Sequence, residues 1–226
     1  SRAVHGVLLI SAALLAASGW LLSTTALNVS ARQGPWWIGI AILGGFGLAE
    51  RFAFHMEYRR ETMSFTLSEV PAAFALVFLG PVAAIVVRLI GSLTVFFFTM
   101  RPARHKLALN GALFSFETAL TFAILHWVCD MPNPSDGRLL VTIAVALAVA
   151  SFVGSLVVSV AIACFEGRVA ERLIAELKTN IVLGPVSAAV AAMAIAPALV
   201  GLAYAPLAVL PVAAVWFVLR QNGRLA

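Results

Sequence analysis

Three charged side chains lie inside long apolar stretches of this sequence. Glu69 and Arg88 are the only charged residues between Ser64 and Met100, and Glu117 is the only one in the following apolar run. In the hydrocarbon of a bilayer, a charged side chain costs at least ~2.5 kcal/mol unless it is paired or hydrated. These residues are therefore the first candidates for a structural ion pair or a functional site.

Arg88 and Glu117 are at matching depths in two consecutive predicted helices. Arg88 is about thirteen residues, and Glu117 about eleven, from the same end of the helix pair. Because consecutive helices are antiparallel neighbours, we expect an ion pair between them. The pair either only fixes the register of the two helices or belongs to a polar pocket for a ligand headgroup or carboxylate.

Further polar residues occur in the same half of the predicted bundle. Pro71 follows Glu69, and we expect it to remove a helix hydrogen bond and so to mark a cavity. Asn110 precedes Glu117 on one predicted helix. This Asn serves either as a ligand contact or as an ordinary cap or interhelical hydrogen bond. The predicted ligand-binding or buried polar network consists of Glu69, Arg88, Asn110 and Glu117.

Sequence patterns for covalent chemistry or metal binding do not occur in this chain. There is no GxSxG, no P-loop, no dinucleotide glycine pattern and no HExxH, and Cys129 and Cys164 fall near opposite ends of the predicted bundle. The two aspartates, Asp130 and Asp136, share one short loop. We therefore predict no catalytic residue, no metal site and no cofactor, and no enzymatic activity for these residues.

The composition requires a membrane around these side chains. Of the 226 residues, 62% are hydrophobic and only 11% are charged, against about a quarter charged in soluble domains. The segment from Leu139 to Phe165 has 27 residues without a charge. At about 1.5 Å per residue it crosses the roughly 30 Å hydrocarbon core as a helix. Unbroken apolar runs of this length predict helices rather than barrel strands.

We predict an all-α, polytopic helix bundle of about eight spans, forming one integral-membrane domain over residues 1–226. The turn signal Gly80-Pro81 divides one long apolar stretch into two spans. Residues 168–179 form either an amphipathic helix along the interface or an extension of a neighbouring helix. The expected spans are residues 4–22, 36–56, 64–79, 82–100, 107–127, 139–165, 181–197 and 203–219.

The basic residues predict the orientation of the bundle. Twelve of the fifteen Lys and Arg residues fall on one face of the eight-span arrangement, and positive loops stay in the cytoplasm. Both termini are thus expected to be cytoplasmic. The net charge of +5 and the pI of about 10.0 are then explained by the basic loops on the cytoplasmic face, and no nucleic-acid partner is expected. Expected partners are membrane lipids and a small or lipid-like ligand, with a homodimer through the transmembrane helices left open.

The stretch from His55 to His126 carries a more specific order of motifs. It contains Ser64-Phe65-Thr66-Leu67-Ser68-Glu69-Val70-Pro71, Leu79-Gly80-Pro81, Arg88-Leu89-Ile90-Gly91, a basic loop with Lys106, and Asn110 followed by Phe114. This order resembles the N-terminal integral-membrane input modules of bacterial cyclic-di-GMP signalling proteins, in which a membrane region precedes GGDEF and EAL domains.

The resemblance covers about a third of the chain. It implies a sensor in the bacterial cytoplasmic (inner) membrane, with a cytoplasmic diguanylate cyclase or phosphodiesterase domain following residue 226. Neither a GGDEF nor an EAL signature occurs within the chain. A small-solute transporter or substrate-binding uptake subunit is the first alternative, and a scaffold subunit of a membrane complex is the second.

Overall fold

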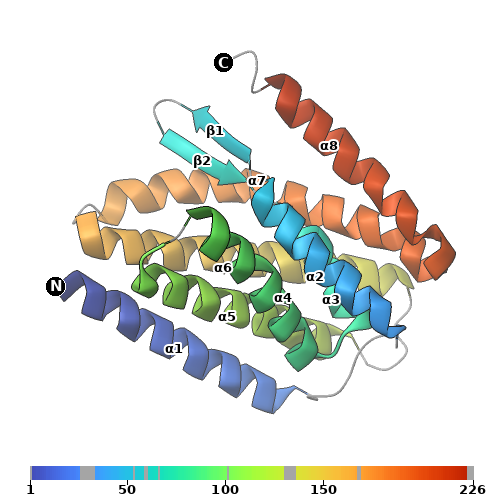
Figure 1. Ribbon diagram of the computed structural model, residues 1–226, viewed down its shortest axis with the longest axis horizontal. Coiled ribbons are helices and arrows are strands. Elements are labelled where there is room, and N and C mark those ends of the chain that lie inside the picture. Colours follow the sequence, from blue (N-terminus) through green and yellow to red (C-terminus); the bar gives the residue numbers. More distant parts are fainter. Residues whose placement is uncertain are drawn as a thin grey trace.

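The protein is a bundle of α-helices with one short β-hairpin. The computed structural model describes residues 2–25, 34–52, 54–58, 61–65, 67–100, 102–129, 136–166 and 169–222. Within these ranges eight α-helices pack side by side (Figure 1), which confirms the predicted helical bundle. The hairpin is the one departure from an all-helical chain among the described residues.

The elements follow one another along the chain without long connections between most of them. The α-helices are α1 (Arg2–Thr24), α2 (Trp36–Arg51), α3 (Glu69–Phe78), α4 (Pro81–Val95), α5 (Arg104–Val128), α6 (Asp136–Glu166), α7 (Val169–Val200) and α8 (Val209–Asn222). A π-helical turn, η1 (Phe96–Met100), extends α4, and a 3-10 segment, η2 (Leu202–Ala208), leads into α8. Two strands, β1 (Phe54–Tyr58) and β2 (Glu61–Phe65), separate α2 from α3.

The hairpin corrects two predicted helix boundaries. The helix expected over residues 36–56 ends at Arg51, and the helix expected over 64–79 begins only at Glu69. Between them β1 and β2 pair antiparallel, from Phe54 opposite Phe65 to Tyr58 opposite Glu61. Aromatic residues and Thr favour strands, and the paired strands satisfy backbone groups that a helix would otherwise satisfy internally.

The helices differ in whether they can cross a bilayer. Four described helical segments are long and apolar enough to do so: Ala3–Thr24, Pro81–Thr99, Arg104–Val128 and Gly137–Ala163. These segments make the chain a membrane protein by length and composition. By contrast, α3 has 10 residues and a length of about 15 Å, which is half of the hydrocarbon thickness.

Within the basic segment of residues 168–179, the described residues 169–179 are part of α7. The helical backbone runs from Val169 to Val200 without interruption, and Pro185 and Pro197 lie inside it. Of the two alternatives for this segment, the structure therefore favours the extension of the seventh helix over a separate interfacial helix.

Helix α3 occupies the interior of the bundle. Six of its residues are buried, and Ala73, Leu76 and Val77 are at most 1% exposed. The other elements surround it, with α2, α4 and α7 against it, α1 along α5, and α6 between α5 and α7 (Figure 1). The polar N-terminus of α3 is thereby brought toward the middle helices.

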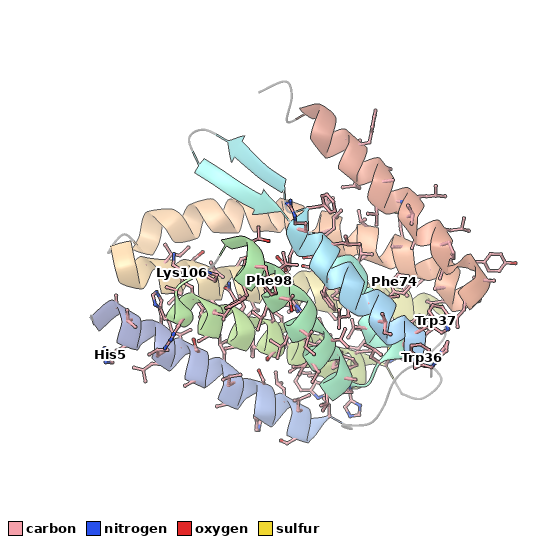
Figure 2. All side chains as sticks on the ribbon, in the orientation of Figure 1. His5, Trp36, Trp37, Phe74, Phe98 and Lys106 are labelled. Carbon is pink, nitrogen blue, oxygen red and sulfur yellow. The ribbon has the colours of Figure 1, made fainter. Side chains whose placement is uncertain are left out.

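The outer surface of the bundle is apolar. Trp36 and Trp37 at the start of α2 point away from the bundle (Figure 2), and Trp36 is 80% exposed. Phe98 in η1 is 74% exposed. Leu9 and Val200 on other helices are 72% and 78% exposed. Large exposed apolar patches on a monomer indicate contact with lipid or with partner helices.

Helices α2 and α4 cross closely at a glycine. A Cβ atom on Gly91 of α4 would lie 2.7 Å from the Leu43 carbonyl oxygen and 2.9 Å from the Cβ of Phe46, both on α2. Contacts this short require the helices to move apart.

We expect the Gly91→Ala substitution to lower the free energy of unfolding by about 1–3 kcal/mol, since overpacking displaces the α2 backbone. Gly44→Ala is the matched control, because a Cβ at Gly44 meets nothing within 4 Å. Denaturant unfolding of both variants in detergent micelles measures the difference. Equal stability of the two variants would contradict the close crossing.

Candidate functional site

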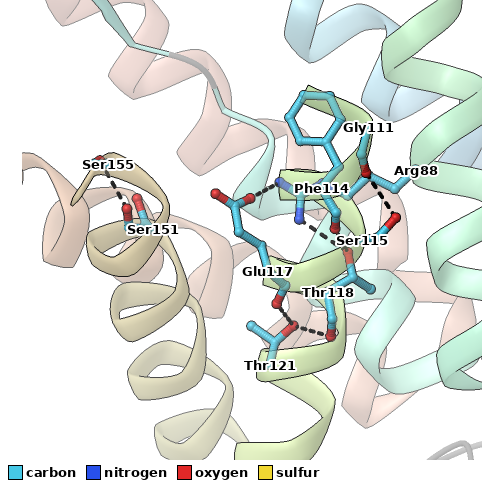
Figure 3. A network of polar contacts seen from close by, with 9 residues as sticks. All are labelled: Arg88, Gly111, Phe114, Ser115, Glu117, Thr118, Thr121, Ser151 and Ser155. Atoms are coloured by element: carbon cyan, nitrogen blue, oxygen red, sulfur yellow. Dashed lines mark hydrogen bonds and ion pairs between the residues drawn. The ribbon is translucent and has the colours of Figure 1, made fainter. Parts of the chain in front are cut away.

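Arg88 is the centre of a polar cluster inside the bundle. It lies on α4 and is 8% exposed. Its Nη2 donates to Glu117 Oε2 on α5 as an ion pair, and its Nη1 donates to Thr118 Oγ1 at 3.2 Å (Figure 3). The predicted pairing of Arg88 with Glu117 is therefore confirmed.

Two aromatic rings lie against the guanidinium of Arg88. The Arg88 Cζ atom lies 4.9 Å from the ring centroid of Phe114 on α5 and 5.8 Å from that of Phe46 on α2. A cation over an aromatic face is attracted by the ring quadrupole, by about 2 kcal/mol when desolvated. The rings thus tie α4 to both neighbours through one side chain.

The Glu117 carboxylate is seated against a glycine of α6. A Cβ atom on Gly154 would overlap Glu117 Oε1. Along α5 itself, Thr118 Oγ1 donates to the Phe114 carbonyl at 2.8 Å and Thr121 Oγ1 donates to the Glu117 carbonyl at 2.9 Å. The threonines are therefore satisfied within the helix, and Thr118 also accepts from Arg88.

Two further glutamates join this ion pair. Glu69, the first residue of α3, and Glu50, in the last turn of α2, both interact electrostatically with Arg88. Ser187 on α7 and Ser151 on α6 face Glu69, and Ser92 on α4 faces Glu50. We call Glu50, Glu69, Arg88, Ser92, Glu117 and Ser187 the polar cluster.

Several atoms of the polar cluster are buried without a hydrogen-bond partner. Among the described side chains these are Glu69 Oε2, Arg88 Nε, Ser92 Oγ and Ser187 Oγ, and one further buried hydroxyl, that of Ser159, lies elsewhere on α6. A buried polar group without a partner destabilises a protein by about 1–3 kcal/mol. The Ser92 and Ser187 hydroxyls also lie toward Glu50 and Glu69, whose carboxyl groups they can hydrogen-bond. The polar cluster is therefore the candidate functional site of the described residues.

The chemistry available in the polar cluster is ion pairing and hydrogen bonding. No three His, Cys, Asp or Glu residues are arranged to hold a metal ion within the described part of the chain. The cluster combines carboxylates, hydroxyls and one guanidinium, which suit the binding of a polar group.

Of the four predicted site residues, three meet and one does not. Glu69, Arg88 and Glu117 belong to the polar cluster. Asn110 is on α5, seven residues before Glu117, and so about 10 Å further along the helix axis. None of the contacts that define the cluster among the described residues involves this Asn, which is half-buried.

The expected effect of Pro71 on helix hydrogen bonding is wrong. Because α3 begins at Glu69, Pro71 is in the first turn, where a backbone N–H has no acceptor within the helix. The Leu67 carbonyl accepts instead from the Val70 N–H at 3.1 Å. The polarity of this region comes from the helix start and from Glu69, not from a broken hydrogen bond.

Sequence reasoning missed Glu50. This glutamate precedes Arg51 at the polar end of α2, where a charged residue ordinarily marks the exit from the membrane. The signal that could have found Glu50 is its spacing from Phe46, because residues four apart share one face of a helix. Phe46 faces Arg88, so Glu50 lies on the same face of α2 as a residue that contacts Arg88.

The excess of carboxylates predicts unequal effects of breaking the ion pair. Arg88→Met leaves three glutamates without their cation, and we expect a loss of about 3–5 kcal/mol in the free energy of unfolding. Glu117→Gln leaves Arg88 with two other carboxylates and a neutral hydrogen-bond partner, so we expect a smaller loss. Denaturant unfolding in micelles measures both. A larger loss for Glu117→Gln would contradict the interaction of Arg88 with Glu50 and Glu69.

Comparisons of this chain with protein-family models, with curated proteins and with solved structures found no match. The resemblance to cyclic-di-GMP input modules therefore stays a prediction that rests on the motifs between His55 and His126.

Proposed function

We propose that this chain is a membrane-embedded sensory module that binds a small or lipid-like ligand at the polar cluster. The observation that carries the proposal is the gathering of three glutamates, two serines and one arginine from α2, α3, α4, α5 and α7 inside the bundle. A ligand that pairs with them stabilises one packing of the helices over others. Differential affinity for two packings is what allows binding to shift a conformational equilibrium.

The arrangement of α2, α3 and α4 supports the eight-span orientation despite the short α3. Gly45 of α2 lies against Pro71 at the start of α3, and Gly39 lies near Leu79 at the end of α3. Gly47 of α2 lies near Val95 at the end of α4. The chain thus runs along α2, returns along α3 and runs along α4 in its first direction. With this alternation, twelve of the fifteen basic residues remain on one side, with both termini cytoplasmic.

The signalling part of the proposal places an output domain on the cytoplasmic side. The resemblance to input modules supports a cyclic-di-GMP output domain after residue 226 and a location in the bacterial cytoplasmic membrane. Helix α8 extends to Asn222, so a rearrangement of the bundle would reach such a domain through a helix.

One observation favours a transporter as the second candidate. Helices α2 and α3 have their ends at the polar cluster, with Glu50 in the last turn of one and Glu69 in the first turn of the other. Helix ends at a buried polar site are typical of secondary transporters with discontinuous helices. Uptake of a solute by proteoliposomes that contain only this chain would favour this candidate.

The orientation predicts the outcome of reporter fusions. A green fluorescent protein fused after Ala226 should fluoresce, and alkaline phosphatase fused there should be inactive, because the first folds in the cytoplasm and the second only outside it. The same pair fused after residue 33 serves as the control and should behave oppositely. Active phosphatase at Ala226 would contradict the eight-span parity.

The ligand-binding role predicts a retained molecule. Native mass spectrometry of the chain extracted from membranes should detect a bound non-protein mass in the wild type and lose it in Glu69→Gln. Glu166→Gln is the matched control, since residue 166 is twelve residues beyond Gly154 on α6, or about 18 Å along the axis. If the wild type carries no bound mass, or if Glu166→Gln loses it equally, the polar cluster is not a ligand site and a scaffold role is favoured.

A further inference from the structure

Exposed aromatic side chains with a polar tip occur near the ends of four elements. They are Trp20 near the end of α1, Trp36 and Trp37 at the start of α2, Trp127 in the last turn of α5 and Tyr204 in η2. Their exposed fractions range from 48% for Trp37 to 80% for Trp36. We call these five residues the aromatic end, because the helix directions bring them to one end of the bundle.

Helices α1 and α5 run in the same direction. Leu14 of α1 packs in one cluster with Leu113 of α5. Further along both helices, Leu21 packs in one cluster with Ala123. The two helices therefore end on the same side, which carries Trp20 and Trp127.

The start of α2 and the η2 segment lie on that side as well. Figure 2 shows Trp36 and Trp37 at one end of the bundle, and His5 and Lys106, which are in the first turns of α1 and α5, at the other. Because α1 and α5 run away from His5 and Lys106, their last turns are on the side of Trp36 and Trp37. The end of α7 and the η2 segment after it are found at this same end (Figure 1).

The spacing between the aromatic end and the basic residues matches the thickness of a bilayer. On α5, Trp127 follows Lys106 by twenty-one residues, or about 32 Å along the helix axis. On α1, Trp20 follows Arg2 by eighteen residues, or about 27 Å. The hydrocarbon core is about 30 Å thick, so a bilayer with the basic residues at one surface has the aromatic end at the other.

The chemistry of these side chains suits the boundary between hydrocarbon and headgroups. Trp and Tyr combine a large apolar ring with one N–H or O–H group that requires a polar partner. At the boundary the ring contacts acyl chains while the polar tip reaches the glycerol and carbonyl groups, which is why both residues are enriched there. Exposed residues between the two ends, such as Leu9 and Val145, are purely apolar.

We propose that the aromatic end binds the headgroup boundary of one phospholipid leaflet, the leaflet opposite the basic loops. In the eight-span orientation this is the outer leaflet. The inference does not depend on the proposed ligand-binding function, but it sets the depth of the polar cluster. Glu117 is ten residues from Trp127 and eleven from Lys106 on α5, or about 15 Å and 17 Å, so the ion pair lies near the middle of the bilayer.

The test measures tryptophan fluorescence of the full 226-residue chain in phosphatidylcholine vesicles. The lipid carries bromine either near the headgroup or near the ends of the acyl chains, and bromine quenches only rings close to it. Three variants keep a single tryptophan, Trp20, Trp37 or Trp127, with the others replaced by Phe. Each should be quenched more strongly by the lipid brominated near the headgroup. The wild type should show the same order, because four of its five tryptophans belong to the aromatic end.

A tryptophan placed at mid-depth is the matched control. Leu9 is 72% exposed and lies eleven residues before Trp20 on α1, or about 17 Å deeper in the bilayer. Leu9→Trp, with every native tryptophan replaced by Phe, should show the reverse order, with stronger quenching by bromine near the chain ends. Circular dichroism should give all variants the helical content of the wild type.

Three results would overturn the inference. Stronger quenching of the wild type and the single-tryptophan variants by bromine near the chain ends would place the rings within the hydrocarbon. No quenching by either lipid would show that protein covers the rings, either a second copy of the chain or another partner. The same order of quenching in Leu9→Trp as in the Trp20 variant would contradict the spacing between mid-depth and the aromatic end.

Discussion

A guanidinium in an apolar interior has to be paired with a carboxylate. The way Arg88 is paired restricts how α2, α4 and α5 are arranged. Its ion pair with Glu117 and its hydrogen bond to Thr118 set α4 against α5. The rings of Phe114 and Phe46 cover it from α5 and α2. An unpaired buried charge costs several kcal/mol. A shift of α4 by one residue along α5 would separate Arg88 from Glu117 and incur this cost. One side chain therefore restricts the register of three helices.

Small residues make this arrangement possible. Gly91 lets α2 and α4 approach until the α2 backbone touches α4, and Gly154 leaves the space that the Glu117 carboxylate occupies on α6. Close approach through small residues is the usual means of packing helices in a membrane, where lipid competes for apolar contacts. The glycines therefore permit the helix spacing at which Arg88 and Glu117 pair.

The glutamates beyond Glu117 argue against a purely structural role for the ion pair. Fixing a register requires one carboxylate opposite one guanidinium, but α2 and α3 each bring another glutamate to the same place. Burying carboxyl groups beyond the number of local cations costs free energy, whether they stay charged or take up a proton. A purely structural role for the ion pair gives no reason for this cost, which is the physical reason to regard the polar cluster as a binding site.

The helical class, the apolar exterior and the pairing of Arg88 with Glu117 follow from the sequence, because apolar run length and the cost of a buried charge act locally or between consecutive helices. Which distant residues join this pair depends on how non-consecutive helices pack. Glu50 enters through the parallel packing of α2 and α4, and Ser187 through the burial of α3 against α7. The hairpin was also beyond the sequence pattern, since its pairing of Phe54 with Phe65 competes with helix extension. Asn110 shares α5 with Glu117 but lies two turns away from it. The sequence shows this separation, but only the packing of the other helices shows that the polar cluster forms around Glu117 and does not extend to Asn110.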